Sequence, residues 1–166
     1  MKSSAKWIDR GWNKFKAGLK TADGSGLVAS VGVQGDGAHE QHEGGATNVS
    51  IGVIHEYGSE DNTNPPARPH WAPTMDENEQ KYLKELKQIP SELLKSGGTI
   101  KGQLRLVGEM YRGDVVLKIK AQIPPPLADS TIEQKRGETT PLDRTGQYIN
   151  SFSVDVKDRS KVDGND

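Results

Sequence analysis

The feature of this sequence that most constrains its fold is a long amphipathic pattern in the second half of the chain. Apolar residues recur there at steps of four, three, four and four, which places them on one face of a helix: Ile100, Leu104, Val107, Tyr111 and Val115. Thr99 is a suitable N-cap, and the three prolines at 124–126 cannot continue a helix. We therefore predict a long helix that starts after Thr99 and ends before these prolines.

A second helix is predicted just upstream of the first. Thr74 can act as its N-cap, and Glu77 three residues later completes a capping box. Because proline lacks an amide proton, we expect a break or kink near Pro90, after which the helix resumes toward Gly97-Gly98. Its apolar residues are Leu83, Leu86, Ile89, Leu93 and Leu94.

Shorter patterns predict the remaining elements. Alternating residues predict a strand over 27–33 and a last strand over 148–156. Residues 49–57 fit either a second strand or a short helix, which Gly58 would close. Residues 130–133 fit a short capped helix. The chain thus combines helices with a small number of strands.

The apolar content allows only a lean core. Hydrophobic residues make up 32% of the 166 residues, a length that fits a single domain spanning 1–166. The absence of cysteine excludes disulfides, thiolate nucleophiles and cysteine-ligated zinc. No apolar run approaches the ~20 residues that cross a bilayer, and the first residues lack the apolar stretch of a secretion signal. We therefore expect a soluble protein made in the cytosol, with no membrane partner.

The charges are segregated along the chain, although the net charge is only -1. Residues 1–20 carry a net charge of +5, residues 21–67 a net charge of -7 and residues 68–166 a net charge of +1. Opposite potentials on one surface allow copies of a protein to meet head to tail. The alternative interpretation is a basic helix beside acidic loops, all of them solvated.

Residues 1–20 are predicted to form a basic amphipathic helix. Ile8, Trp12, Phe15 and Leu19 form one stripe, while Lys6, Arg10 and Lys14 lie on the far side. Such a helix can bind nucleic acid or a membrane surface. Alternatively, Trp12 and Phe15 pack against the domain's own sheet and the lysines stay in solvent. The first reading makes a nucleic-acid-binding module that acts through residues 1–20 the alternative function.

Two further segments are predicted to lack regular structure. Residues 34–48 are rich in glycine, histidine and acidic residues and have little apolar surface to bury, so we expect a long, exposed, mobile acidic loop. The polar residues 158–166 are expected to form a flexible tail.

The histidines do not form a convincing metal or catalytic motif. His55-Glu56 resembles the start of a zinc-protease helix, but the residue four positions after His55 is Ser59 rather than a second histidine. His39 and His42 lie in the glycine-rich segment, which would not preorganise a site. Nucleophile elbows and phosphate-binding loops are also absent from the sequence. We therefore expect no enzyme activity, with no catalytic residues, cofactor or metal ion.

Four segments stand out, although each taken singly fits an ordinary turn. They are His55-Glu56-Tyr57-Gly58, Pro66-Ala67-Arg68-Pro69-His70-Trp71, Pro126 to Lys135 and Pro141 to Ser151. In this order they resemble a family of tailed-phage neck or tail-completion proteins, also called virion morphogenesis proteins, over roughly residues 50–156. Members typically carry "HEFG", then "PARPF" opening a helix, then a "PLxxSTIxxK…PLxDTGxLxxSI" block. Here Arg144 stands where an aspartate commonly precedes Thr-Gly, and residues 34–48 resemble an insertion.

The resemblance implies a fold, a function and a set of partners. The fold would be of the α/β (α+β) class, with a small mixed or antiparallel sheet flanked by helices. The function would be that of a structural virion protein at the head–tail junction, which forms a homo-oligomeric ring, expected to be a hexamer, around the DNA channel. Its partners would be the tail tube or tail terminator and the head connector or adaptor proteins. It would be made in the host cytoplasm, and DNA would pass through the ring without sequence recognition.

The same resemblance suggests which residues form protein interfaces. We expect the proline-rich segment 64–73 to be a rigid arm that contacts a neighbouring copy or a tail protein. Arg68 would anchor it by hydrogen bonds to a carboxylate, for which Glu56 of the same or another copy is the candidate. The full set of expected interface residues is His55, Glu56, Tyr57, Pro66, Arg68, Pro69, Trp71, Asp143, Arg144, Thr145 and Gly146.

Overall fold

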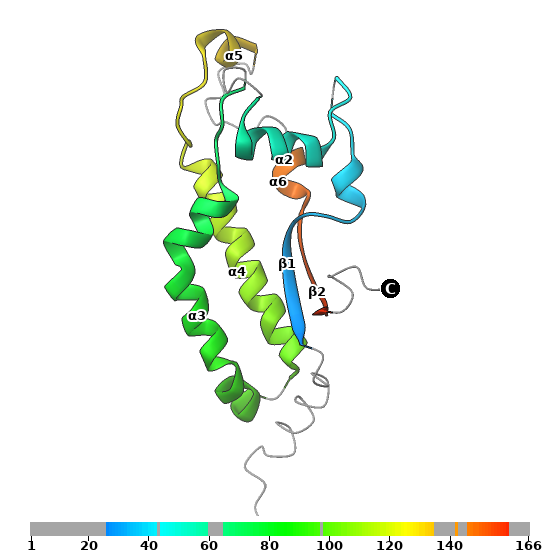
Figure 1. The fold of residues 1–166 in the computed structure, drawn as a ribbon, viewed down its shortest axis with the longest axis vertical. Helices are drawn as coiled ribbons and strands as arrows, with labels where there is room; N and C mark the ends of the chain where they lie inside the picture. Colours follow the sequence, from blue (N-terminus) through cyan, green and yellow to red (C-terminus); the bar gives the residue numbers. More distant parts are fainter. Residues whose placement is uncertain are drawn as a thin grey trace, which may run out of the picture.

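Two long helices and a two-stranded sheet form the body of the molecule (Figure 1). The computed structural model describes residues 26–42, 44–59, 65–96, 98–134, 142 and 146–159. The chain order of this body is strand β1 (Leu27–Val33), helix α3 (Trp71–Ser96), helix α4 (Ile100–Lys120) and strand β2 (Phe152–Asp158). The prediction of an α+β fold with a small antiparallel sheet is confirmed. The predicted helix over 1–20 and nearly all of the predicted tail lie outside the described residues.

The two strands pair antiparallel, from Leu27 opposite Asp158 to Val33 opposite Phe152. Side chains on β2 alternate, and Phe152, Val154 and Val156 are buried. The predicted last strand therefore exists, but the prediction that it begins at Tyr148 is wrong. Gly146, with a φ of 72°, instead opens the short helix α6 (Gln147–Asn150), which places Tyr148 in helical backbone.

The predicted amphipathic helix is confirmed as α4. The Thr99 hydroxyl accepts a hydrogen bond from the Gly102 amide at 3.0 Å, as expected of an N-cap. The helix packs against the sheet at Gly108, where an added Cβ would lie 2.5 Å from Cγ1 of Val154 and 3.3 Å from Cγ2 of Val31. A glycine at this position allows the helix and the sheet to approach each other more closely than a larger residue would permit.

Helix α3 differs from its prediction at its start, and of the break or kink expected near Pro90 the break does not occur. It begins at Trp71 rather than after Thr74, whose hydroxyl lies inside the helix and donates to the carbonyl of His70 at 2.6 Å. The predicted capping box is therefore wrong, because the N-terminus of α3 is capped from another element. The helix also runs without a break through Pro90, which lies on its exposed side.

The choice left open for residues 49–57 is resolved in favour of a helix, α2 (Asn48–Tyr57). The Thr47 hydroxyl accepts from the Ser50 amide at 3.2 Å and caps its start. Gly58, with a φ of 85°, ends it, and its amide donates to the carbonyl of Ile54. The predicted short helix near residue 130 is present as α5 (Asp129–Gln134), but it begins at Asp129, so Ser130 lies inside the helix rather than at its cap.

The segment 34–48 has more structure than the expected exposed loop. It contains a short 3-10 helix, η1 (Asp36–His39), and both Ala38 and Asn48 are buried. The Asn48 amide group donates to the carbonyl of Gly37 at 2.7 Å, and its oxygen lies 2.6 Å from Nε2 of His42. The prediction of exposure is therefore wrong for these two residues, since hydrogen bonds supply the order that apolar burial alone could not.

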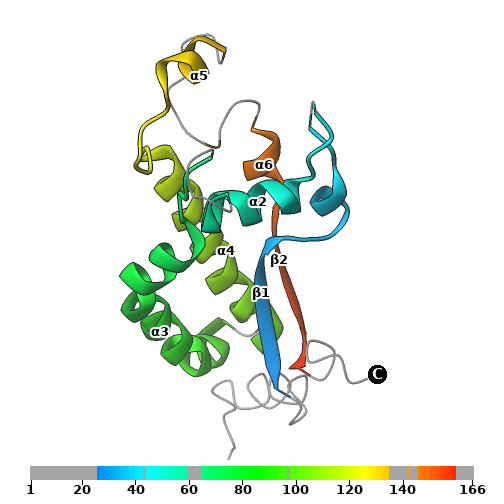
Figure 2. The same ribbon diagram turned by 45° about the horizontal axis from the view of Figure 1, so that its top comes forward.

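The main core lies where α4, α6 and β2 meet, toward the upper end of α4 in Figures 1 and 2. Its buried members are Val115, Ile119, Ile123, Tyr148 and Phe152. Trp71 extends this core, because its ring packs on Phe152 with 4.7 Å between centroids and edge-on to Tyr111 at 5.9 Å. Among the described helices, none is both long enough and apolar enough to cross a bilayer.

Candidate functional site

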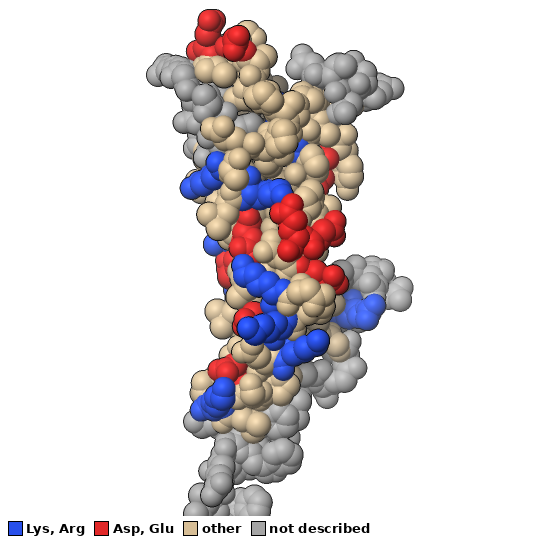
Figure 3. Space-filling model, turned by 90° about the vertical axis from the view of Figure 1, so that its left-hand side faces the viewer, with Lys and Arg blue, Asp and Glu red and all other residues tan. Residues whose placement is uncertain are grey.

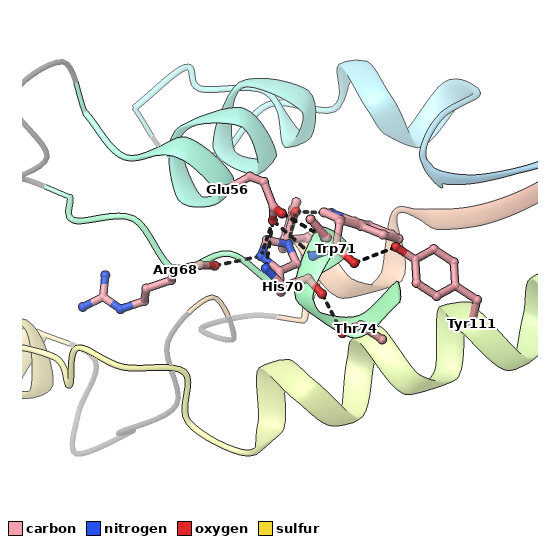
Figure 4. A network of polar contacts seen from close by, with 8 residues as sticks. Glu56, Arg68, His70, Trp71, Thr74 and Tyr111 are labelled. Carbon is pink, nitrogen blue, oxygen red and sulfur yellow. Dashed lines mark hydrogen bonds and ion pairs between the residues drawn. The ribbon is translucent and has the colours of Figure 1, made fainter. Parts of the chain in front are cut away.

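The four segments that carry the family resemblance come together around the N-terminus of α3 (Figure 4). Glu56 belongs to the first segment, Arg68, His70 and Trp71 to the second, Pro126 to the third and Tyr148 to the fourth. Polar contacts join the second segment to each of the other three. We call the set Glu56, Arg68, His70, Trp71 and Tyr148 the cap network.

Glu56 caps helix α3 from the end of helix α2. One carboxylate oxygen accepts hydrogen bonds from the amides of His70 at 2.8 Å and Trp71 at 3.1 Å, and the other accepts from Ala72 at 3.1 Å. The first amides of a helix have no partner within the helix, and the helix dipole favours a negative charge there. Glu56 thus satisfies three amides that Thr74, placed inside the helix, cannot reach.

His70 is fully buried at the centre of the network. Its Nδ1 lies 3.0 Å from the Arg68 carbonyl, which can only accept a hydrogen bond, so Nδ1 carries the proton. Nε2 then accepts from the hydroxyl of Tyr148 at 2.8 Å, and the indole of Trp71 donates to the same hydroxyl oxygen at 3.4 Å. A neutral imidazole therefore satisfies every contact around it.

Burial moves the pKa values of the titratable groups in this region further from neutral pH. Desolvation lowers the pKa of His70, although the Arg68 carbonyl and the Glu56 carboxylate oppose the shift. Burial raises the pKa of Tyr148 and of Tyr111 to about 12 each. The hydroxyl of Tyr111 donates to the carbonyl of Trp71 at 2.8 Å. These groups consequently act at neutral pH as fixed hydrogen-bond partners.

Arg68 connects the proline-rich segment before α3 to the proline-rich segment after α4. Its Nε donates to the carbonyl of Pro125 at 2.9 Å and a terminal nitrogen donates to Pro126 at 3.3 Å, while the residue is only 4% exposed. The expected pairing with Glu56 does not occur within one copy, because the Glu56 oxygens face the amides of α3 and the guanidinium points away from them (Figure 4).

The surface that adjoins this network is apolar. On α2, the side chains of Val49, Val53, Ile54 and Tyr57 are 38%, 53%, 39% and 77% exposed. Val49, Val53 and Tyr57 follow one another at steps of four and therefore share one helix face. A groove of about 360 Å³ runs beside them, between α2, β1 and the start of α3. We call these four residues the α2 face.

The structure separates the residues predicted to form interfaces into different groups. Tyr57 lies on the α2 face, whereas Glu56, Arg68 and Trp71 belong to the cap network. The backbone carbonyl of His55 accepts from the Arg68 amide at 2.6 Å. The remaining members are Pro66 and Pro69, half-buried beside Arg68, Gly146, which opens α6, and Asp143, Arg144 and Thr145, outside the described residues.

Sequence reasoning missed two residues that complete the network. Tyr148 was assigned to a strand, although it is the residue that contacts both His70 and Trp71. Gly52 on α2 was not singled out, yet a Cβ there would lie 3.0 Å from the Tyr148 hydroxyl. Gly146 has a positive φ, which glycine adopts readily, so this glycine two residues before Tyr148 is the signal of a turn there.

The residues considered for metal binding are used differently. His42 contacts the side chain of Asn48, and His39 ends η1 in an exposed position. Within the described ranges, no three histidine or acidic side chains lie close enough to hold one metal ion. Glu56 faces the amides of α3.

Charges of both signs alternate on the face formed by the long helices (Figure 3). Lys81 pairs with Asp114 at 2.6 Å, and Arg112 pairs with Glu109 at 2.7 Å along α4. Lys118 also reaches from α4 to Glu77 on α3. Among the described residues on this face, the cations therefore form no continuous basic stripe of the kind typical of nucleic-acid-binding surfaces.

Comparison with known proteins adds no relative to this picture. Neither protein-family models, nor curated proteins, nor solved structures give a match to the chain. The described chain is an α+β domain in which a buried polar network adjoins an exposed apolar helix face.

Proposed function

We propose that this chain is a structural virion protein of the neck or tail end of a tailed phage. In this role, copies of the chain assemble into a ring, a hexamer, that completes the tail and joins it to the head connector. The protein acts by assembly rather than by catalysis, without cofactor or metal ion.

The observation that carries the proposal is the α2 face. Four large apolar side chains lie exposed on a helix of ten residues, next to an apolar groove. Contiguous exposed apolar surface on a soluble protein is typical of a protein–protein interface. A ring needs such a surface on every copy, because each copy contacts the next through two different faces.

The convergence of the four sequence segments supports the same proposal. Segments that are separated by up to about 90 residues in the chain contact one another around a single helix end. The residues behind the family resemblance therefore form one structural unit. In that unit the cap network holds α2 against α3, and so fixes the position of the α2 face.

The charge distribution also fits assembly through unlike faces. The segment 21–67, which includes β1 and α2, has a net charge of -7 and contains no lysine or arginine. Residues 1–20 carry +5. Surfaces of opposite sign favour contacts between two different faces over contacts between two identical ones.

A complementation experiment tests the function. Tails from a phage mutant that lacks this chain are mixed with the purified chain and with filled heads, and infectious particles are counted. We expect the wild-type chain and the control Gln80→Asp, on the exposed side of α3, to restore joining. We expect Val53→Asp to fail, because a charge would then lie within the α2 face. A wild-type chain that leaves tails and heads unjoined would refute the function.

The rival function, nucleic-acid binding through residues 1–20, gives a different result. Its binding to duplex DNA would be tight at low salt and would weaken steeply as salt is added. It would also be abolished by replacing Lys6, Arg10 and Lys14 with glutamine, whereas Val53→Asp would leave it unchanged. Such a pattern, together with failed complementation, would favour the rival.

A further inference from the structure

A second and larger apolar groove lies toward the start of β1, whereas the groove beside the α2 face lies toward its end. Figures 1 and 2 show α4 between α3 and β1, and these three elements enclose a groove of about 790 Å³. Its apolar lining includes Leu27 and Val31 of β1, Leu83 of α3, and Leu104 and Val107 of α4. On α3 the side chains of Met75 and Leu86, which lie at the two ends of the wall, are 41% and 36% exposed.

The charged residues that line this groove are both acidic. Asp76 and Glu79 lie on the α3 wall, in the half nearer to Met75, and the other lining residues carry no charge. An occupant that fits the groove therefore needs an apolar stripe together with positive charge beside it.

We infer that residues 1–20 of the same chain occupy this groove. These residues lie outside the part of the chain that the structure describes, and their sequence alone identifies them. They combine an apolar stripe with a net charge of +5. Leu19 lies eleven positions after Ile8, as Leu86 lies eleven positions after Met75, and eleven helical steps extend about 16 Å.

The connection to β1 favours the chain's own segment over that of another copy. Leu27, the first residue of β1, itself lines the groove, at the end close to the connection between α3 and α4 (Figure 1). Seven residues lie between Leu19 and Leu27, and the eight steps from one to the other can span at most about 28 Å. A tether this short gives the segment a high effective concentration at its own groove.

The shorter connection favours one direction of the segment. Leu19 lies nearest to β1 in sequence, and a position beside Leu86 keeps its connection to Leu27 short, so the segment runs parallel to α3 and Ile8 pairs with Met75. The stripe then faces the groove, and Lys6 and Arg10, on the opposite side of the helix, stay in solvent above the half that holds Asp76 and Glu79. This placement does not depend on the proposed virion function.

Disulfide trapping in the full chain tests the inference, because the sequence contains no cysteine. Phe15→Cys combined with Leu83→Cys should form a bond within one chain at least tenfold faster than Lys14→Cys combined with Leu83→Cys. The two pairs share the same tether and differ only in the helix face presented to the groove. Equal rates for the two pairs would overturn the inference, as would a bond that joins two chains.

Replacing Phe15 removes part of the apolar stripe, so a second pair of cysteine substitutions tests docking with Phe15 kept. Ile8→Cys with Met75→Cys should form a bond within one chain, and Ile8→Cys with Leu86→Cys should form it at least tenfold more slowly. The reverse order of rates would contradict the parallel direction. Bonds at equal rates for both pairs would show that the segment is not held in the groove.

Discussion

The cap network and the α2 face meet on helix α2, where Glu56 belongs to the first and its neighbours to the second, but they differ in almost every physical property. The Glu56 carboxylate is only 10% exposed and accepts three hydrogen bonds, whereas Val53 and Tyr57 are apolar and more than half exposed. One helix turn separates these two environments. The residues that the sequence motifs single out stabilise the fold, whereas the apolar residues beside them form the exposed surface that is available for binding.

This difference changes how the sequence motifs should be interpreted. Arginine and histidine in a proline-rich segment suggest a binding arm, but Arg68 and His70 are buried and their contacts lie within the chain. Buried polar groups stabilise the fold when all of their hydrogen bonds are made, and they destabilise it when a hydrogen-bond partner is removed. Substitutions in the cap network should therefore lower the stability of the fold. Substitutions on the α2 face should instead impair assembly and leave the stability nearly unchanged.

The largest effect on stability is expected from Arg68→Ala. The change removes the hydrogen bonds to the carbonyls of Pro125 and Pro126 and the packing of the long side chain, so the free energy of unfolding should fall by about 3 kcal/mol. Urea denaturation measures it. Arg105→Ala, at an exposed position on α4, is the matched control and should change the value by less than about 0.5 kcal/mol. Equal effects for the two variants would place Arg68 outside the network.

A smaller loss is expected from Tyr148→Phe, which removes one oxygen and keeps the ring. Nε2 of His70 loses its donor in a fully buried position, so the free energy of unfolding should fall by about 2 kcal/mol. Tyr57→Phe removes the same oxygen from a side chain that is 77% exposed and should have almost no effect. If Tyr148→Phe were equally neutral in denaturation, the hydrogen bond to His70 would not contribute to stability.

The network should also make stability depend on pH. The pKa of His70 is lowered from 6.5 in the folded chain, so below that value the unfolded chain binds more protons and unfolding is favoured. The charged and titratable groups that face its ring are Glu56 on α2 and Tyr148 on α6. Stability should be complete above about pH 6.5 and should fall as the pH is lowered below that value. Thermal denaturation of the wild type and of His70→Gln measures this fall, which should be smaller in the variant; an equal fall in both would assign it to other groups.

The helices could be predicted from the sequence where local patterns determine them. Thr99 and the stripe that follows it specify α4, because both the cap and the apolar face are encoded within a few residues. The start of α3 could not be predicted in this way. Its cap comes from Glu56, fourteen residues before the amide of His70, and no local pattern reveals a carboxylate supplied by another helix.

The candidate site was predictable only in part for the same reason. The sequence pointed to Glu56, Arg68 and Trp71, and these residues do come together, but their roles depend on partners far away in the chain. Tyr148 and Gly52 escaped attention because only the tertiary structure brings α6 against α2. The exposure of Val53 was likewise not predictable, since an apolar residue on a short helix is more often buried.

The smallest effect on stability is expected from Val53→Asp on the α2 face. The side chain is 53% exposed, so the free energy of unfolding of the monomer should change by less than about 0.5 kcal/mol. Urea denaturation under dilute conditions measures it, with Gln80→Asp as the control for an added charge. A loss as large as that of Arg68→Ala would mean that the α2 face contributes to the fold of one copy and is not a free surface.

The central claim is that copies of this chain associate through the α2 face, and the mass in solution tests it most directly. Light scattering on the eluting protein should give about 109 kDa for wild type and for Gln80→Asp, the mass of six 18.1 kDa chains. Val53→Asp should give the mass of a single chain while remaining folded. A wild-type protein that stays monomeric at high concentration, or a Val53→Asp variant that still assembles, would contradict the account.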